Sequence, residues 1–523
     1  MFYPFKKIKV SSIFLVLIGQ VLAVGFLLWL MAGWVFPFTT DSMVYISTAE
    51  NIVRFKGLLF TNFFVRPPFP DVLPLSIWPP GYPISIAVLK WMGVNEYAAA
   101  LILPRLCCLF LPFLFWGIFR RLIAENIALF ASGMCSLTFS VLSSSVFVWS
   151  DTPYLSLCLL VLMMTFDIIE KKTSVHWSVI LLAGVLSGVA FLIRYIGISL
   201  IASIGICLII GFMIRAMTFK DLMRMICFYG LGVCLPVVPY IVRNLVVFGT
   251  VSAYSYHVSK AVFLSNLVVV VRLYFQGLSS MVFGKGSFTW IIVAFMIVSV
   301  GWFLGRARDL IKESPTKFIY IALLLVYFFS QSVLLIYYRS EALIPGNPDI
   351  DGRLMMQLSW ILLGGAIFAV HAGLKGRYGE KGIKVFIFFL VLSFVLIQVF
   401  TAVEFYKTQT KIKVLSRKIS QYFPARGIPA DYVIVSNVPE ITNYFAKRDV
   451  RAIDNYTPGD LLYNLGPYRK FVVFLVKGAG QLSPAWQYAD EWRKPGNYKL
   501  AYLDQEVDLL VPLVKVSVRQ IHP

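Results

Sequence analysis

Two carboxylates stand at boundaries between apolar and polar sequence. Asp41 directly follows the first long apolar run, and Asp151 opens another run within Val148-Trp-Ser-Asp-Thr-Pro-Tyr154. A carboxylate at such a boundary could act as a general base or as a metal ligand. Asp is costly near hydrocarbon, and a Ser or Asn would cap a helix equally well, so we predict a catalytic role for Asp41. We predict one for Asp151 as well, since a residue that caps a helix can also be catalytic. The alternatives are a capping or snorkelling role for Asp41 and a helix start with Pro153 in its first turn for Asp151.

Three arginines form a second group of candidates. Arg243 lies where one apolar run ends, Arg353 lies where a later run begins, and Arg194 interrupts a third. A guanidinium group can hold a phosphate with two parallel hydrogen bonds, which suits a phosphate at a membrane surface. We therefore predict that these arginines bind a phosphate. The alternative is pairing with lipid headgroups or with Asp349 or Asp351.

Metal ligands are sparse in this sequence. The four His residues are scattered, and neither His nor Cys forms a cluster with metal-ligand spacing. Carboxylates drawn from Asp41, Asp151, Asp349 and Asp351 could hold a Mg²⁺, Mn²⁺ or Ca²⁺ ion, so a divalent cation is the one cofactor that remains open. The sequence contains no P-loop, dinucleotide fingerprint or Gly-Xaa-Ser-Xaa-Gly elbow, which argues against ATP, NAD or serine-hydrolase chemistry.

The composition indicates which solvent surrounds these residues. Hydrophobic residues make up 59% of the 523 positions and charged residues only 14%, whereas soluble domains have about 25% charged residues. The chain is therefore predicted to be a polytopic membrane protein. Its net charge of +21 comes from short basic clusters between apolar runs, a pattern typical of topology signals and not of nucleic-acid binding.

About eleven apolar segments are long enough to span a membrane. They lie near residues 13–36, 98–119, 126–143, 152–169, 177–193, 196–214, 223–241, 288–305, 318–337, 354–371 and 383–403. With a cytoplasmic N-terminus, eighteen Lys or Arg residues collect on the inner side, as the positive-inside rule requires. We therefore expect a multi-pass protein of the cytoplasmic membrane whose first span is uncleaved and whose C-terminal part lies outside. The 177–214 region is either two short spans or one broken span.

The first loop, residues 37–97, then lies outside. Residues 41–55 have helical spacing and predict a helix that lies flat on the membrane, with Asp41, Tyr45, Thr48 and Asn51 on its polar face. Trp78-Pro-Pro-Gly-Tyr-Pro83 is predicted to be a rigid, non-helical corner, because prolines restrict the residues before them and lack backbone donors. The aromatic residues Tyr45, Trp78 and Tyr82 are predicted to bind substrate.

The last 120 residues are more highly charged and contain short runs typical of β-strands, at 432–436, 469–476 and 507–511. A helical candidate, Pro439 to Lys447, lies between them. Strands that alternate with a helix predict a small α/β domain over residues 404–523, on the outer face, following a transmembrane domain over residues 1–403. The fold class is therefore an all-α polytopic membrane protein with a small extracytoplasmic α/β domain.

Several motifs carry a resemblance to a known family. They are Asp41, the Ala-Glu-Asn-Ile helix, the Trp-Pro-Pro-Gly-Tyr-Pro corner, Ser150-Asp151, Gly188-Val-Ala-Phe-Leu-Ile-Arg194-Tyr, Arg243-Asn244 followed by Phe248-Gly249, Asp351-Gly-Arg353 and Val435-Ser436-Asn437-Val-Pro-Glu. Together they resemble the C-type (GT-C) membrane glycosyltransferases, in particular the protein-mannosyltransferase and aminoarabinose-transferase-like group.

The resemblance implies an enzyme that moves a sugar from a polyprenyl-phosphate donor to a hydroxyl of a glycan, lipid or protein on the outer face. The residues agree with this chemistry, because an acceptor hydroxyl needs a base such as Asp41 and a phosphate leaving group needs cations such as the boundary arginines. The alternatives are a transporter or flippase for a lipid-linked or anionic substrate, and a scaffold that recruits partners. Transporters usually carry charged residues within their spans, whereas here the charges lie at the outer edge.

Overall fold

The computed structural model describes most of the N-terminal 251 residues and parts of the remainder. The described residues are 10–61, 72–76, 78–171, 175–251, 266–276, 301–342, 356–367 and 398–410, apart from 268, 302, 366, 404 and 408, together with five strands between 433 and 512. Asp349, Asp351 and Arg353 lie outside them, as do most of the segments predicted at 288–305 and 383–403 and the helix predicted at 439–447.

The chain divides into two compact units. The first contains residues 1–33, 76–82 and 98–406, and the second contains residues 34–75, 83–97 and 407–523.

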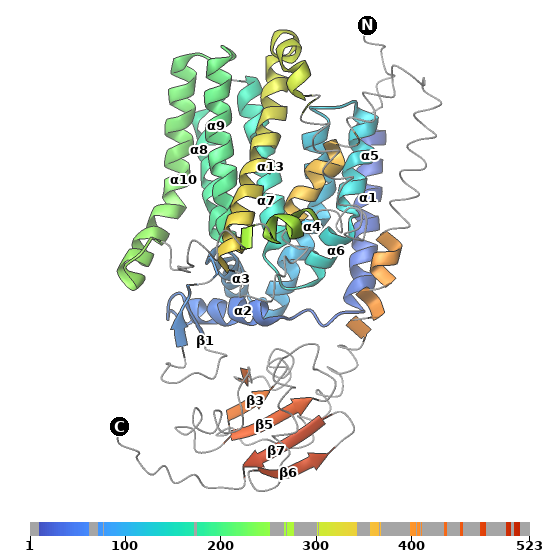
Figure 1. Ribbon diagram of the computed structural model, residues 1–523, viewed down its shortest axis with the longest axis vertical. Helices are drawn as coiled ribbons and strands as arrows, with labels where there is room; N and C mark the ends of the chain where they lie inside the picture. Colours follow the sequence, from blue (N-terminus) through green and yellow to red (C-terminus); the bar gives the residue numbers. More distant parts are fainter. Residues whose placement is uncertain are drawn as a thin grey trace. The chain divides into compact units, whose positions relative to one another are not determined.

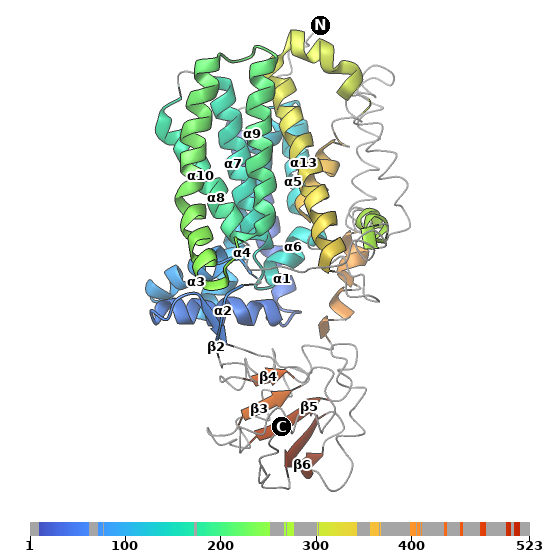
Figure 2. The ribbon, with the colours of Figure 1, turned by 60° about the vertical axis from the view of Figure 1, so that its left-hand side comes forward.

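The first unit consists of long helices that run side by side (Figures 1 and 2). Their bounds are α1 Val10–Ala32, α4 Glu96–Phe119, α5 Glu125–Ser136, α6 Phe139–Val146, α7 Asp151–Lys171, α8 Trp177–Ile193, η2 Tyr195–Gly197, α9 Ile198–Met213, α10 Phe219–Phe248 and α13 Pro315–Ala342. Glu96 and Tyr97, at the start of α4, belong to the second unit. Helix α8 packs between α7 and α10, and α9 packs against α13.

Six of the described helices are long and apolar enough to cross a membrane. A seventh candidate is the α5–α6 pair, whose two helices are bent by 48°. The chain is therefore a mostly helical, multi-pass membrane protein, as predicted. The 177–214 region forms two helices, because α8 ends at Ile193 and the short turn η2 separates it from α9. The number of eleven spans stays a prediction.

Glycine allows α8 and α10 to pack closely. A Cβ atom added at Gly184 would lie 2.2 Å from the carbonyl oxygen of Tyr229, and one added at Gly232 would lie 2.2 Å from that of Leu181. A side chain at either position would clash with the backbone of the facing helix. Small residues of this kind are typical of closely packed helices in membranes.

The second unit contains the first loop. Its elements are α2 Thr40–Val53, β1 Leu59–Thr61, β2 Val72–Pro74 and most of α3, Gly81–Trp91, whose first two residues belong to the first unit. The predicted helix at 41–55 is confirmed, but its predicted polar face is wrong in part: Tyr45 is 5% exposed and Thr48 is fully buried. The spacing of hydrophobic residues within one helix does not show which of its polar residues are buried by other parts of the protein.

The prediction that Trp78 to Pro83 is not helical is also wrong in part. Trp78 to Pro80 are non-helical, but Gly81, Tyr82 and Pro83 form the first turn of α3. Pro83 is tolerated there because the first N–H groups of a helix have no partner within the helix in any case.

The described C-terminal residues form a five-stranded sheet. Its strands are β3 Val433–Ser436, β4 Val450–Ala452, β5 Phe471–Val476, β6 Tyr498–Leu503 and β7 Val507–Pro512, in the order β4-β3-β5-β7-β6. Strand β3 pairs in parallel with β4 and β5, whereas β7 pairs antiparallel with β5 and β6. Strands β3, β5 and β7 coincide with the three runs expected from the sequence.

Candidate active site

Asp151 is the first residue of α7, and its side chain is 1% exposed. The preceding helix α6 helps to hold it, because the Ser145 hydroxyl lies 3.0 Å from the Thr152 hydroxyl. Between the two helices the rings of Phe147 and Trp149 stack with their centroids 4.4 Å apart. The carboxylate is therefore held at a rigid helix start, and the helix-start position that the sequence indicated is compatible with a catalytic role.

The Asp151 carboxylate forms a buried ion pair. Its Oδ1 accepts a hydrogen bond from Arg194 Nη1 at 2.5 Å, and the Arg194 side chain is 18% exposed. Gln357 donates its Nε2–H to the Asp151 carbonyl oxygen at 2.9 Å. Asp151 Oδ2 and Gln357 Oε1 are buried and have no hydrogen-bond partner within the described segments. The pair thus joins α7, the end of α8 and the helix at residues 356–367.

Arg194 sits at a break in the backbone. It follows α8 in an extended conformation, with φ −148° and ψ 128°, and precedes the turn η2. The Trp-Pro-Pro-Gly corner packs against this break: a Cβ atom added at Gly81 would lie 2.7 Å from the backbone of Leu192 and 2.8 Å from the nitrogen of Ile193. Gly81 is therefore needed for the close approach that places Arg194.

We expect Gly81→Ala to displace the end of α8 and to weaken the site. The added methyl group meets backbone atoms that cannot rotate away, and overpacking of this kind costs about 1–3 kcal/mol. Thermal unfolding and transfer kinetics of the purified variant measure the effect. The matched control is Gly205→Ala on α9, where nothing lies within 4 Å of the added Cβ. Equal stability and kinetics for the two variants would contradict the packing role.

Arg243 lies near the end of α10. Its Nη1 donates to Asn244 Oδ1 at 3.0 Å, and its guanidinium lies 4.9 Å from the centroid of the Phe248 ring. The side chains of Tyr195 and Tyr240 are within electrostatic range of the same guanidinium. Of the three predicted phosphate-binding arginines, Arg194 thus pairs with a residue of another helix, Arg243 contacts two residues of its own helix, and Arg353 lies outside the described residues.

Asp41 lies in the first turn of α2, but it is not the capping residue. The N-cap is Thr39, whose backbone N–H donates to Ser42 Oγ at 2.9 Å. The two hydroxyl groups of Thr39 and Ser42 lie 3.0 Å apart. Since Thr39 and Ser42 perform the capping, the alternative role of Asp41 as a helix cap loses its support. Asp41 and Asp151 belong to different units.

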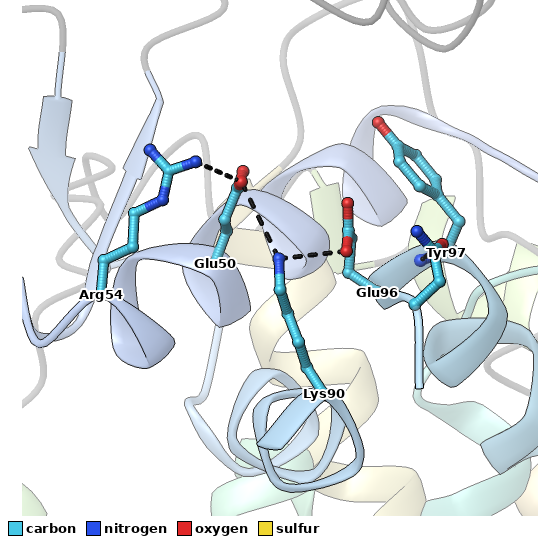
Figure 3. A network of polar contacts seen from close by, with 6 residues as sticks. Glu50, Arg54, Lys90, Glu96 and Tyr97 are labelled. Carbon is cyan, nitrogen blue, oxygen red and sulfur yellow. Dashed lines mark hydrogen bonds and ion pairs between the residues drawn. The ribbon is translucent and has the colours of Figure 1, made fainter. Parts of the chain in front are cut away.

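A network of ion pairs joins the helices of the first loop (Figure 3). Lys90 on α3 lies 3.0 Å from Glu96 at the start of α4 and 3.8 Å from Glu50 on α2. Glu50 also accepts a hydrogen bond from Arg54 at 2.7 Å. The network holds α2, which carries Asp41, against α3. This network was not predicted from the sequence, although one lysine and two glutamates in a loop with few charges were a usable signal.

The predicted substrate-binding residues differ in environment. Tyr82 is 1% exposed, and its hydroxyl donates to the Ala100 carbonyl oxygen at 2.7 Å. Tyr45 is buried, whereas Trp78 is half-buried. The hydrogen bond of Tyr82 indicates that it packs the corner against α4. Substrate binding by the three residues stays a prediction.

A metal site is not formed by the described residues alone. Among them, no three His, Cys, Asp or Glu side chains gather closely enough to hold an ion. Asp151 Oδ2 is a buried acceptor without a partner in the described part of the chain, so it could take a cation or a hydrogen-bond donor. A divalent cation at Asp41 or Asp151 stays a prediction.

Two features of the site were missed in the sequence. One is Gln357, which lies three residues after the start of the span predicted at 354–371. It carried a usable signal, because polar residues within spans are often functional. Tyr195 and Tyr240, whose hydroxyl groups meet at 2.5 Å, carry no such signal. Tyrosine is common at membrane boundaries, and a separation of 45 positions in the chain conceals the contact.

One protein-family model matches part of this chain. The family model described as dolichyl-phosphate-mannose-protein mannosyltransferase matches residues 79–242. This range includes Asp151 and Arg194 and ends one residue before Arg243. No curated protein matches the sequence significantly.

Two solved structures have a similar fold. One is the oligosaccharyltransferase AglB from Archaeoglobus fulgidus, in complex with an inhibitory peptide and a dolichol-phosphate, with a TM-score of 0.58, 11% identity and coverage of 90% of this chain and 70% of that one. The other is ArnT from Cupriavidus metallidurans bound to undecaprenyl phosphate, with a TM-score of 0.55, 11% identity and coverage of 96% and 98%. The resemblance expected from the sequence is confirmed: this chain is an integral multi-pass membrane protein whose fold is similar to that of AglB and ArnT, and its residues 79–242 match the family model of the protein mannosyltransferases.

Proposed function

We propose that this chain is a glycosyltransferase that moves a sugar from a polyprenyl-phosphate-linked donor to an acceptor hydroxyl. The observation that carries the proposal is the buried pair of Asp151 and Arg194, which lies within the region matched by the mannosyltransferase family model. The two solved structures support the same donor class, because their bound lipids are a dolichol-phosphate and undecaprenyl phosphate. The acceptor is a glycan, a lipid or a protein.

The proposed reaction is an inverting displacement. The acceptor oxygen attacks the anomeric carbon while the bond between that carbon and the phosphate oxygen breaks. The hydroxyl proton passes to the Asp41 carboxylate, and the polyprenyl phosphate leaves with the bonding electrons. Cationic groups stabilise the charge that develops on the leaving phosphate. Asp151 supports this step by orienting the Arg194 guanidinium through its hydrogen bond to Nη1.

The test of this function is a transfer assay. Purified protein is mixed with a membrane lipid fraction that carries radiolabelled sugar, and transfer of the label from lipid to a new product is measured, with Asp41→Asn as the inactive control. A protein that moves the labelled lipid across vesicle membranes without cleaving it would be the transporter or flippase that the sequence left open. If the protein has neither activity, the remaining hypothesis is a scaffold that recruits partners.

We assign the donor phosphate to Arg353, with Arg243 as a second contact and Arg194 as a third. A charge-assisted hydrogen bond contributes about 1.5–3 kcal/mol, or roughly 10–150-fold in kcat/KM for the lipid donor. Arg353→Lys keeps the charge but loses the two-pronged geometry, so we expect it to retain only part of this effect. Donor and acceptor kinetics of both Arg353→Lys and Arg353→Ala measure it. A normal donor KM with a lowered melting temperature would instead indicate a structural pair with Asp349 or Asp351.

We further propose eleven spans in the cytoplasmic membrane, with the N-terminus inside and residues 404–523 forming an outer α/β domain. All seven native cysteines fall in or beside apolar runs. A cysteine introduced by Ser483→Cys should therefore report the C-terminal part with a membrane-impermeant thiol reagent in intact cells or spheroplasts. Labelling only after lysis would reverse the proposed orientation.

A further inference from the structure

Three segments of the first unit meet at two tyrosine hydroxyl groups. The hydroxyl of Tyr195, in η2, lies 2.5 Å from that of Tyr240, on α10, and their rings stack with centroids 6.3 Å apart. The Tyr195 hydroxyl also donates to the carbonyl oxygen of Ser76 at 3.2 Å. A carbonyl can only accept, so the single proton of Tyr195 points to Ser76, and Tyr240 supplies the proton between the two hydroxyl groups.

Each tyrosine is close in sequence to one of the arginines. Tyr195 directly follows Arg194, which pairs with Asp151. Tyr240 precedes Arg243 by three residues in α10, so the two side chains lie on the same face of the helix, one turn apart. The hydroxyl contact therefore links the backbone that carries Arg194 to the backbone that carries Arg243.

Two prolines lie in the second half of α10. Pro236 and Pro239 remove two backbone N–H groups from the ladder of the helix, and such positions allow bending. Beyond Pro239 most large apolar side chains are exposed: Val242, Leu245, Val246 and Val247. In this last part of α10 Tyr240 and Asn244 are the buried residues, and Asn244 bonds within its own segment, to Val251. The Tyr240 hydroxyl is thus the described polar contact that ties this part of α10 to η2.

We propose that Tyr240 is a positioning residue that fixes Arg243 relative to Arg194 through Tyr195. The inference rests on the proposed function, since the two guanidinium groups need a fixed spacing to bind one lipid phosphate. Tyr240→Phe keeps the ring and removes only the donor. It leaves the Tyr195 oxygen without that proton and allows the end of α10 to move. We expect the Kd for a polyprenyl monophosphate to rise about 3–10-fold, the size expected for one hydrogen bond.

The matched control is Tyr229→Phe. Tyr229 lies on the same helix, is 7% exposed against 6% for Tyr240, and donates its hydroxyl to Ser187 on α8 at 2.9 Å. It is about four turns away from Arg243 on α10, so its removal should lower the melting temperature without changing the Kd. Arg243→Met combined with Tyr240→Phe completes a double-mutant cycle. If Tyr240 acts through Arg243, the second substitution has no further effect on the Kd.

The experiment measures binding of a polyprenyl monophosphate in detergent and, separately, the mobility of a spin label at Val246→Cys. The background carries Cys227→Ser and Cys234→Ser, because both of these cysteines are exposed on α10. We expect Tyr240→Phe to mobilise the label and Tyr229→Phe to leave it unchanged. Equal Kd changes for the two variants, additive effects with Arg243→Met, or an unchanged label would overturn the positioning role. If the wild-type protein binds no polyprenyl monophosphate but Tyr240→Phe still mobilises the label, the proposed function is overturned. The structural role of the Tyr195–Tyr240 contact is then retained.

Discussion

Asp41→Asn is expected to lower turnover by about 10²–10⁴-fold, the usual contribution of a general base. The variant keeps the size of the side chain and removes its charge. The N-terminus of α2 should remain intact, because Thr39 and Ser42 form the cap. The measurement is kcat with saturating lipid donor, together with the melting temperature of the same preparation.

The matched control for Asp41→Asn is Glu50→Gln, which removes one negative charge from the same helix. Glu50 pairs with Arg54 and Lys90 and is half-buried. We expect this change to weaken the packing of α2 against α3 by about 0–1 kcal/mol, as for other partly exposed pairs, and to leave turnover largely intact. If Asp41→Asn retains near-normal turnover, or if both variants lose it equally, Asp41 is not the base.

Arg194→Met is expected to destabilise the protein by about 3–5 kcal/mol, because it leaves the Asp151 carboxylate buried without its counter-charge. That side chain is 1% exposed, so water cannot replace the guanidinium without local opening. The measurement is the thermal unfolding of purified protein in a fixed detergent. We also expect loss of transfer activity, because Arg194 is one of the arginines proposed to bind the donor phosphate.

Two further variants distinguish the loss of the buried Asp151–Arg194 ion pair from the general effect of removing a charged side chain. Asp151→Asn combined with Arg194→Met removes both charges and should recover much of the stability without recovering activity. Arg121→Met is the matched control, since Arg121 pairs with Asp167, which is 42% exposed and therefore screened. Its loss should cost about 0–1 kcal/mol. Equal destabilisation by Arg121→Met and Arg194→Met would show that the buried Asp151–Arg194 pair contributes no more to stability than the partly exposed Arg121–Asp167 pair.

The sequence by itself was sufficient for the membrane class and for most of the helices. A run of about 20 apolar residues must satisfy its backbone polar groups internally in lipid, so α1, α4, α7, α9 and α13 were predictable from length and composition. Strands β3, β5 and β7 were predictable because short β-branched and aromatic runs favour extended backbone. The carboxylate candidates also stood out because acidic residues are scarce in this sequence, and the arginine candidates because the positive-inside rule disfavours arginines at boundaries predicted to be outer ones.

Only the tertiary structure decided which of these residues meet. Asp151 and Arg194 are 43 positions apart, and their pairing depends on the break after α8, which the Gly81 corner contacts. Likewise Tyr45 and Thr48 lie on the polar face of α2 by periodicity, yet they are buried. Periodicity is a property of a single helix. Which side chains are covered, and which charges pair, depends on the angle and depth at which separate elements pack, and these follow from contacts between residues that are distant in the chain.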